Sequence, residues 1–194
     1  IFQVGYKGQF MTVSSALNSQ KLNNGTINNI ALGFKLGSKI GWAFGFNPAT
    51  TVGYKIIVTE SFTDANGKEF PLIYNFEGDG GYTKLYMGFS YEIFTKNDTV
   101  LGQLSSLSAG ININYYNGNK RSLYDVIYNS GDFSYYNTRY EESQILSDFG
   151  FDLGIQYQTY LKKVSPSNYV NLSLGATVNI PKNLNTKWIS NYYT

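Results

Sequence analysis

The chain has 194 residues, a formal net charge of +2 and no Cys or His; 17% of its residues are aromatic and 14% are charged. Without Cys these residues form no disulfide, thiolate metal site or cysteine nucleophile, and without His they lack the commonest general base and metal ligand. The small net charge gives no reason to expect a nucleic acid partner. We therefore predict no catalytic residues, no metal, no cofactor and no enzymatic activity.

The first clear elements are two strands, 30–36 and 40–46, joined by a three-residue turn at 37–39 that contains Gly37. A short turn with Gly is typical of a β-hairpin. The predicted register pairs Leu36 with Ile40 and Phe34 with Trp42, and continues to Ile30 opposite Phe46. Bulky side chains then share one face, and Gly, Ala and Lys35 occupy the other.

Two longer runs of alternating residues follow, 52–58 and 70–76, with a turn predicted at 64–67. Each run is separated from a neighbouring strand by an interruption, at 47–49 and at 78–81. Pro and Gly inside a strand pattern indicate bends or bulges where backbone pairing is broken. We therefore predict one ribbon that crosses a bilayer and projects beyond it. The candidates for a strand bend or a lateral gap are Pro48, Gly78, Gly80 and Gly81.

Four further strands are predicted at 85–93, 107–115, 145–157 and 170–178, because bulky apolar residues occupy every second position. About 9 to 11 tilted residues are enough for a strand to cross a bilayer. The apolar set is predicted to face lipid, and it includes Phe34, Trp42, Phe89, Phe151, Leu153 and Leu174. The other face is small or polar, as in the wall of a wet lumen, and its charged candidates are Lys35, Lys84, Asp148 and Asp152.

These strands predict an all-β fold, an antiparallel transmembrane β-barrel of which residues 1–194 form one segment. The shorter predicted connections, 37–39, 95–103 and 162–168, fall on one side of the membrane, and the longer ones fall on the other. Short periplasmic turns and long external loops are typical of outer-membrane barrels. We therefore expect a bacterial outer-membrane location, with an external loop at 16–25 and a long Tyr-rich one at 117–142, which has some extended structure at 124–128.

Three polar features have alternative interpretations. The segment Glu77–Gly81 lacks both the following Lys-Ser or Lys-Thr of a phosphate loop and the spacing of a calcium loop, so a bend is preferred. Asp148 and Asp152 share a face and could act as an acid–base pair, but in a barrel they would line the lumen, opposite Lys35 or Lys84. The loop 117–142 could recognise a partner or be a solvated surface.

The segments Ile30–Tyr54 and Tyr74–Phe89, with a Gly-x-Gly-Gly pattern at 78–81, resemble the FadL-type outer-membrane transport family of Bacteroidetes. The resemblance implies a barrel of about fourteen strands, with an N-terminal hatch and the remaining strands outside residues 1–194. It also implies passage of hydrophobic small molecules. The family includes a plug that closes the type IX protein secretion translocon, so the alternative is a non-catalytic partner of a large translocon subunit. In both cases the surrounding partner is the lipid bilayer.

Overall fold

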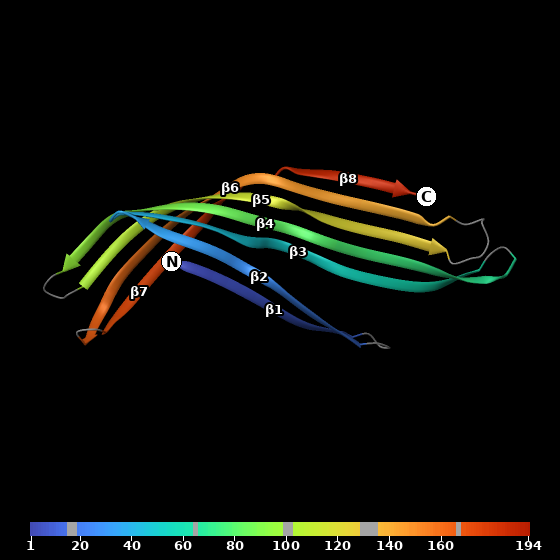
Figure 1. Ribbon diagram of the computed structural model, residues 1–194, viewed down its shortest axis with the longest axis horizontal. Helices are drawn as coiled ribbons and strands as arrows, with labels where there is room; N and C mark the ends of the chain where they lie inside the picture. Colours follow the sequence, from blue (N-terminus) through green and yellow to red (C-terminus); the bar gives the residue numbers. More distant parts are fainter. Residues whose placement is uncertain (15–18, 64–65, 99–102, 129–135, 166–167) are drawn as a thin grey trace. The chain divides into compact units, whose positions relative to one another are not determined.

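A computed structural model describes residues 1–14, 19–63, 66–98, 103–128, 136–165 and 168–194, and all the regular structure among them is β (Figure 1). None of the described residues forms a helix long and apolar enough to cross a membrane. One sheet has the order β1-β2-β3-β4-β5-β6-β7, and β8 also pairs with β6. The strands are β1 Phe2–Ser14, β2 Ser19–Leu36, β3 Ile40–Thr63, β4 Glu69–Asp98, β5 Gln103–Tyr128, β6 Thr138–Ser165, β7 Asn168–Ile180 and β8 Thr186–Tyr193.

The predicted hairpin between β2 and β3 is confirmed in its register. Leu36 lies opposite Ile40, Phe34 opposite Trp42 and Ile30 opposite Phe46, and the strands are antiparallel. Gly37 begins the turn with φ 71°, a left-handed conformation that Gly adopts without a Cβ penalty. Turn chemistry and the alternation of large and small residues therefore specify the same pairing.

The four central strands are longer than a bilayer crossing requires. β3 has 24 residues, β4 has 30, β5 has 26 and β6 has 28, whereas a crossing needs about 9 to 11. β3 continues through Pro48 and β4 continues through 78–81. Both strands are therefore continuous through the predicted interruptions and longer than one crossing requires, and their crossing of a bilayer stays a prediction.

The predicted long loop at 117–142 is wrong for residues 117–128 and 138–142, which are strand, and the extended structure predicted at 124–128 is confirmed. β5 continues to Tyr128 and β6 begins at Thr138, and residues 129–135 lie outside the described part of the chain. Tyr, Asn and charged residues occupy both faces here, so no apolar alternation marks the strands. Ion pairs and aromatic contacts with neighbouring strands stabilise them instead.

The other connections are also shorter than predicted. β2 begins at Ser19, so the expected loop at 16–25 is wrong for residues 19–25. The predicted connections at 95–103 and 162–168 are shorter than expected, because β4 extends to Asp98 and β6 extends to Ser165. Positions 15–18, 64–65, 99–102 and 166–167 fall outside the described residues.

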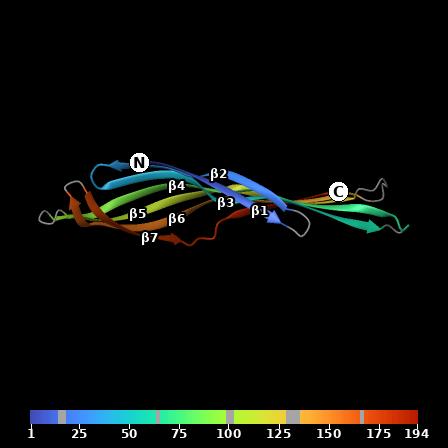
Figure 2. The same cartoon turned by 90° about the horizontal axis from the view of Figure 1, so that it is seen from below.

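Contacts between Cα atoms divide the chain into two compact units. Unit 1 comprises Ile1–Asn47, Lys84–Tyr115 and Phe149–Asn183. It contains the hairpins β1–β2 and β6–β7, whose antiparallel registers run from Phe2–Leu32 to Ser14–Ser19 and from Phe151–Ile180 to Ser165–Asn168. Figure 2 shows the strand β1 beside β2.

The apolar side chains of unit 1 are mostly exposed. Phe34, Phe89, Phe151, Leu153 and Leu174, all predicted to face lipid, are between 40% and 57% exposed. Trp42 is half-buried, because its ring stacks on Phe89 with centroids 6.1 Å apart and also lies near Phe34. A contiguous exposed apolar surface is unusual for a protein in water, whereas it is the normal outer face of a barrel strand in lipid.

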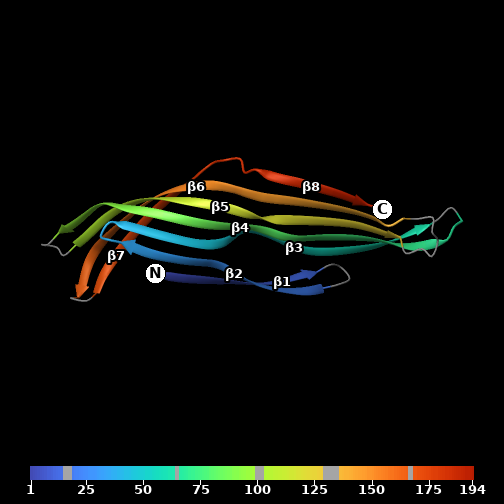
Figure 3. The ribbon, with the colours of Figure 1, turned by 45° about the horizontal axis from the view of Figure 1, so that its top comes forward.

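Unit 2 comprises Pro48–Thr83, Tyr116–Asp148 and Leu184–Thr194. It holds the buried apolar side chains of the described residues, Phe70, Leu72, Tyr82 and Leu146. Within it β8 pairs antiparallel with the first part of β6, from Arg139–Tyr193 to Leu146–Thr186 (Figure 3). The described part of unit 2 therefore buries apolar side chains, and that of unit 1 does not.

Candidate functional site

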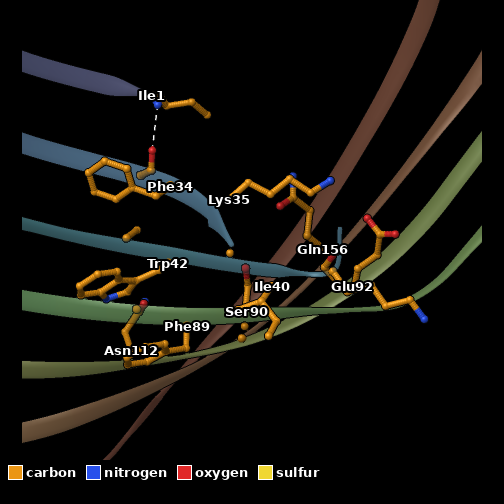
Figure 4. Close-up of a pocket in the computed structure, with 18 of the residues that line it drawn as sticks. Ile1, Phe34, Lys35, Ile40, Trp42, Phe89, Ser90, Glu92, Asn112 and Gln156 are labelled. Carbon is orange, nitrogen blue, oxygen red and sulfur yellow. Dashed lines mark hydrogen bonds between the residues drawn. The ribbon is translucent and has the colours of Figure 1, made fainter. Parts of the chain in front are cut away.

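A cavity of about 680 Å³ in unit 1 is lined by small and polar residues together with the bulky apolar residues Phe34, Trp42 and Phe89. Figure 4 shows Lys35 extending toward Gln156 and Glu92, and the α-amino group of Ile1 donating a hydrogen bond to the carbonyl oxygen of Gly33 at 2.8 Å. Strands β2 to β6 all contribute to its lining. The small and uncharged polar residues among them include Gly41, Ala43, Gly88, Ser90, Ser108, Gly110, Asn112, Gly154 and Gln156.

The glycines of the predicted polar face leave room for longer side chains on the adjacent strand. A Cβ at Gly41 would overlap the hydroxyl of Ser90, and a Cβ at Gly88 would overlap the side-chain amide oxygen of Asn112. Gly45 lies under the ring of Tyr86, where a Cβ would come within 2.6 Å of the ring carbon that carries the hydroxyl. On the predicted polar face, a glycine of one strand therefore lies beside a polar side chain of the neighbouring strand, which occupies the space that a Cβ would need.

The four charged lumen candidates have separate surroundings. Lys35 lines the cavity of unit 1, and the Lys84 Nζ atom lies 5.9 Å from the ring centroid of Tyr86. Asp152 accepts a hydrogen bond from Asn179 Nδ2 at 2.6 Å. Asp148, which is 8% exposed, accepts one from the backbone N–H of Asn185 at 2.9 Å. Each carboxylate is thus held by the chain that follows β6, and their pairing with Lys35 or Lys84 stays a prediction.

Sequence analysis did not predict the ion-pair network of unit 2. Lys55 pairs with Glu77 at 3.5 Å, Arg121 with Asp79 at 3.0 Å and with Glu141 at 3.9 Å. Because residues 75, 77 and 79 alternate along β4, they share one face. The sequence contains one sign of this network, the alternate spacing of the polar residues on β4. It does not show which residues of the neighbouring strands lie opposite them, because that depends on the strand register.

Asp125 is the most buried member of this network. Its carboxylate is 4% exposed and accepts hydrogen bonds from Arg139 Nε at 2.7 Å, Arg139 Nη2 at 3.1 Å and Asn75 Nδ2 at 3.2 Å. The hydrogen bond from Arg139 lowers the pKa of Asp125, burial opposes this, and Asn75 adds to the lowering. A cavity of about 500 Å³ borders the pair, with Thr138 and Tyr193 in its lining.

The opposite face of unit 2 is aromatic. Tyr124 lies 6.4 Å from Tyr74 and 4.9 Å from Phe76, measured between ring centroids, and Tyr140 lies 4.6 Å from Tyr192. The Tyr-rich segment that was expected in a loop is therefore one face of paired strands, with Asp125 and Arg139 on the other face.

The glycines predicted to mark a bend lie in close contact with neighbouring strands of unit 2. Gly80 has φ 97°, and a Cβ there would overlap the carbonyl oxygen of Asn119. A Cβ at Gly81 would overlap the carbonyl oxygen of Thr50, and Gly78 lies under the ring of Tyr54. These contacts favour a tight joint between β3, β4 and β5. A lateral gap at Pro48 or at these glycines stays a prediction.

The charged side chains of these sites form ion pairs and hydrogen bonds. In the described ranges, no three acidic side chains are grouped so as to hold a metal ion. The carboxylates described above are engaged by Arg, Lys or amide donors, which suits a structural network. The arrangement offers a mixed apolar and polar lining in unit 1, and a charged and an aromatic face in unit 2.

Comparison with known proteins identifies the family. No curated protein and no solved structure matches the chain. The resemblance to FadL-type transporters is not confirmed. The family model described as BamG matches residues 1–194. The chain therefore belongs to the BamG family, which is related to the outer-membrane assembly machinery (BAM) of Bacteroidetes-type bacteria.

Proposed function

We propose that the chain is a section of an outer-membrane β-barrel wall that serves the outer-membrane assembly machinery as a non-catalytic subunit. The observation that carries the proposal is the match of the BamG family to the entire chain. The exposed apolar residues of unit 1 support it, because they suit contact with lipid. Unit 2, with its buried apolar side chains and its ion pairs, is the part suited to water.

The composition of the chain and the surroundings of its buried carboxylate support a non-catalytic subunit role. The chain has no His or Cys, and Asp125 is held by Arg139 and Asn75. A carboxylate with a lowered pKa and three donors is a poor general base, since a catalytic base needs a pKa near the working pH. The work of this protein is then binding, positioning or closure.

The test is affinity purification of the tagged full-length protein from outer membranes of its own bacterium in mild detergent. We expect the protein in the outer-membrane fraction, with components of the assembly machinery in stoichiometric amounts. A Phe151→Arg variant is the control for membrane insertion, because Phe151 is on the exposed apolar face. Purification with a type IX translocon, or without any protein partner, would contradict the proposal.

Passage of hydrophobic small molecules is a second candidate, favoured by the cavity of unit 1. Gly154 lines this cavity, and a Cβ there would make only ordinary contacts, the nearest at 3.6 Å to Thr177. Gly154→Leu should therefore reduce uptake of a fluorescent fatty acid into proteoliposomes without lowering the melting temperature. Equal uptake by vesicles that lack the protein would remove this candidate.

A further inference from the structure

The apolar face of unit 1 contains a groove of about 440 Å³ over the small side chain of Ala109. Its lining consists of Ile40, Phe89, Ser90, Tyr91, Ala109, Gly110 and Ile111. All except Ser90 and Gly110 belong to the alternating set whose side chains occupy the apolar face. Ala109 stands between the bulky residues Leu107 and Ile111 along β5, so the depression is about one side chain wide. We call it the Ala109 groove.

Tyr91 is the neighbour of Ala109 on β4. A Cβ at Gly110 would lie 2.9 Å from the Phe89 carbonyl oxygen and 3.4 Å from the Ser90 Cβ. Gly110 and Ser90 therefore face each other, which places Ala109 opposite Tyr91 in the antiparallel pair. The side chains at the rim are open, since Tyr91 is 52% exposed and Phe89 is 42% exposed. The groove is thus an accessible apolar surface.

The groove lies entirely within unit 1, at the end that carries the turn 37–39. Ile40 is the first residue of β3, whereas the part of β3 that belongs to unit 2 begins at Pro48. The strand between these two residues spans about 26 Å, at about 3.3 Å per residue. The description of the groove therefore uses contacts within one unit only.

A cation and a phenol mark the turn end of the groove. Lys39 is exposed in the turn before Ile40, and its carbonyl oxygen accepts a hydrogen bond from the Glu92 N–H, next to Tyr91, at 2.8 Å. In the described ranges the Lys39 ammonium has no ion pair, and the Glu92 carboxylate accepts a hydrogen bond from the Thr95 hydroxyl. Tyr and Lys combine an apolar body with a polar tip, which suits the boundary between hydrocarbon and water.

We propose that the Ala109 groove binds one acyl chain of a phospholipid with a net negative head group, and that Lys39 attracts its phosphate. An apolar depression one side chain wide fits a hydrocarbon chain, whereas a helix or a strand is too broad to enter it. The groove is continuous with exposed apolar residues suited to lipid, and its one polar end is cationic. The proposal rests on the membrane location in the proposed function and is independent of the assembly machinery.

Trp42 can report on the groove, because its ring stacks on Phe89 with centroids 6.1 Å apart. The chain has two Trp, so the full-length protein with Trp188→Phe retains only Trp42 in these residues. We would place it in phosphatidylcholine vesicles with a rising fraction of phosphatidylglycerol that carries bromine on its acyl chains and quenches Trp on contact. Half-maximal quenching should need an about fivefold lower fraction than with brominated phosphatidylcholine, which is the attraction expected of one Lys for anionic lipid.

Two variants separate the head group from the acyl chain. Lys39→Gln should remove the preference for phosphatidylglycerol and leave quenching by brominated phosphatidylcholine unchanged. Ala109→Leu fills the groove and should weaken quenching by both lipids. Ala176→Leu makes the same change on the apolar face of β7, opposite Ile155, and is the matched control that should quench like the parent. Melting temperatures in the same vesicles check that each variant is folded, and Lys39→Gln decides the question if Ala109→Leu is not.

Equal quenching by the two brominated lipids in the parent protein would overturn the proposal, as would unchanged quenching in a folded Ala109→Leu variant. Stronger competition by unbrominated lipid A than by unbrominated phosphatidylglycerol would also overturn it, because the groove would then select a different lipid. Co-purification with the assembly machinery is not involved in any of these measurements, so their failure is distinguishable from failure of the proposed function.

Discussion

Arg139 donates two hydrogen bonds to the carboxylate of Asp125, from Nε to Oδ1 at 2.7 Å and from Nη2 to Oδ2 at 3.1 Å. The same carboxylate accepts a bond from Asn75. Because the three residues belong to β4, β5 and β6, one buried charge joins three neighbouring strands of unit 2. Two-pronged Arg–carboxylate pairs are stronger and more directional than single hydrogen bonds.

Replacing Asp125 should destabilise unit 2 more than replacing the exposed acid Asp79. Asp125→Ala removes three hydrogen bonds and leaves Arg139 and Asn75 without this partner, and we expect a loss of about 1–3 kcal/mol. Asp79→Ala breaks a pair whose side chains are half-exposed, which should cost less than about 1 kcal/mol. Urea unfolding of both variants in the same lipid measures the difference. Equal losses would show that the burial of Asp125 contributes nothing.

The Asp125–Arg139 pair should also make stability depend on pH. The pKa of Asp125 is lowered in the folded protein, so its contribution is complete above the unfolded pKa of about 3.9. It is lost as pH falls through the lower folded pKa. The melting temperatures of the native protein and Asp125→Asn should therefore differ by a constant amount at neutral pH and converge in acid. A difference that grows in acid would reverse the assigned sign.

The two faces of β6 in unit 1 should tolerate substitution differently. Phe151 is 40% exposed on the apolar face, and Phe151→Arg should cost about 2–4 kcal/mol if the residue lies near the bilayer midplane. The adjacent Asp152→Asn should cost little, because an amide oxygen can still accept the hydrogen bond from Asn179. Refolding into lipid vesicles at graded denaturant measures both. Similar costs at the two positions would contradict the assigned faces.

Gly80 and Gly53 form a matched pair for testing the joint between strands. A Cβ at Gly80 would overlap the carbonyl oxygen of Asn119, and φ there is 97°, whereas Gly53 has nothing within 4 Å of the Cβ position. Gly80→Ala should cost about 1–3 kcal/mol, while Gly53→Ala should be neutral or stabilise by less than about 1 kcal/mol. Thermal unfolding provides the comparison. A neutral Gly80→Ala would favour the looser, gap-like arrangement.

Digestion with trypsin should distinguish a turn from a strand segment that the sequence analysis predicted to be a loop. Lys39 lies in the β2–β3 turn, and Lys120 and Arg121 lie within β5. Ordered strand backbone resists proteolysis and exposed turns do not. Cleavage of the folded protein should therefore occur after Lys39 well before it occurs after Lys120 or Arg121, as mass spectrometry of the fragments would show. In intact cells the cut at Lys39 should require opening of the outer membrane, since this turn is predicted to be periplasmic.

Local patterns in the sequence were sufficient for the strands of unit 1 from residue 30 onward, but not for β1 or the first part of β2. Alternation of bulky and small residues fixes which face each side chain occupies, and Gly37 with a three-residue turn fixes the register from Leu36–Ile40 to Ile30–Phe46. These features depend on neighbours along the chain, so they can be read without a structure. The polar environment of Lys35 follows from the same alternation.

Only the tertiary structure decided the organisation of unit 2. The strands at 117–128 and 138–142 mix Tyr with charged residues, and their stability comes from partners far away in sequence, such as Asn75 for Asp125 and Asp79 for Arg121. β8 pairs with β6 and not with β7, its predecessor in sequence. Pairing between distant strands is set by the summed cross-strand contacts, which a single local segment does not encode.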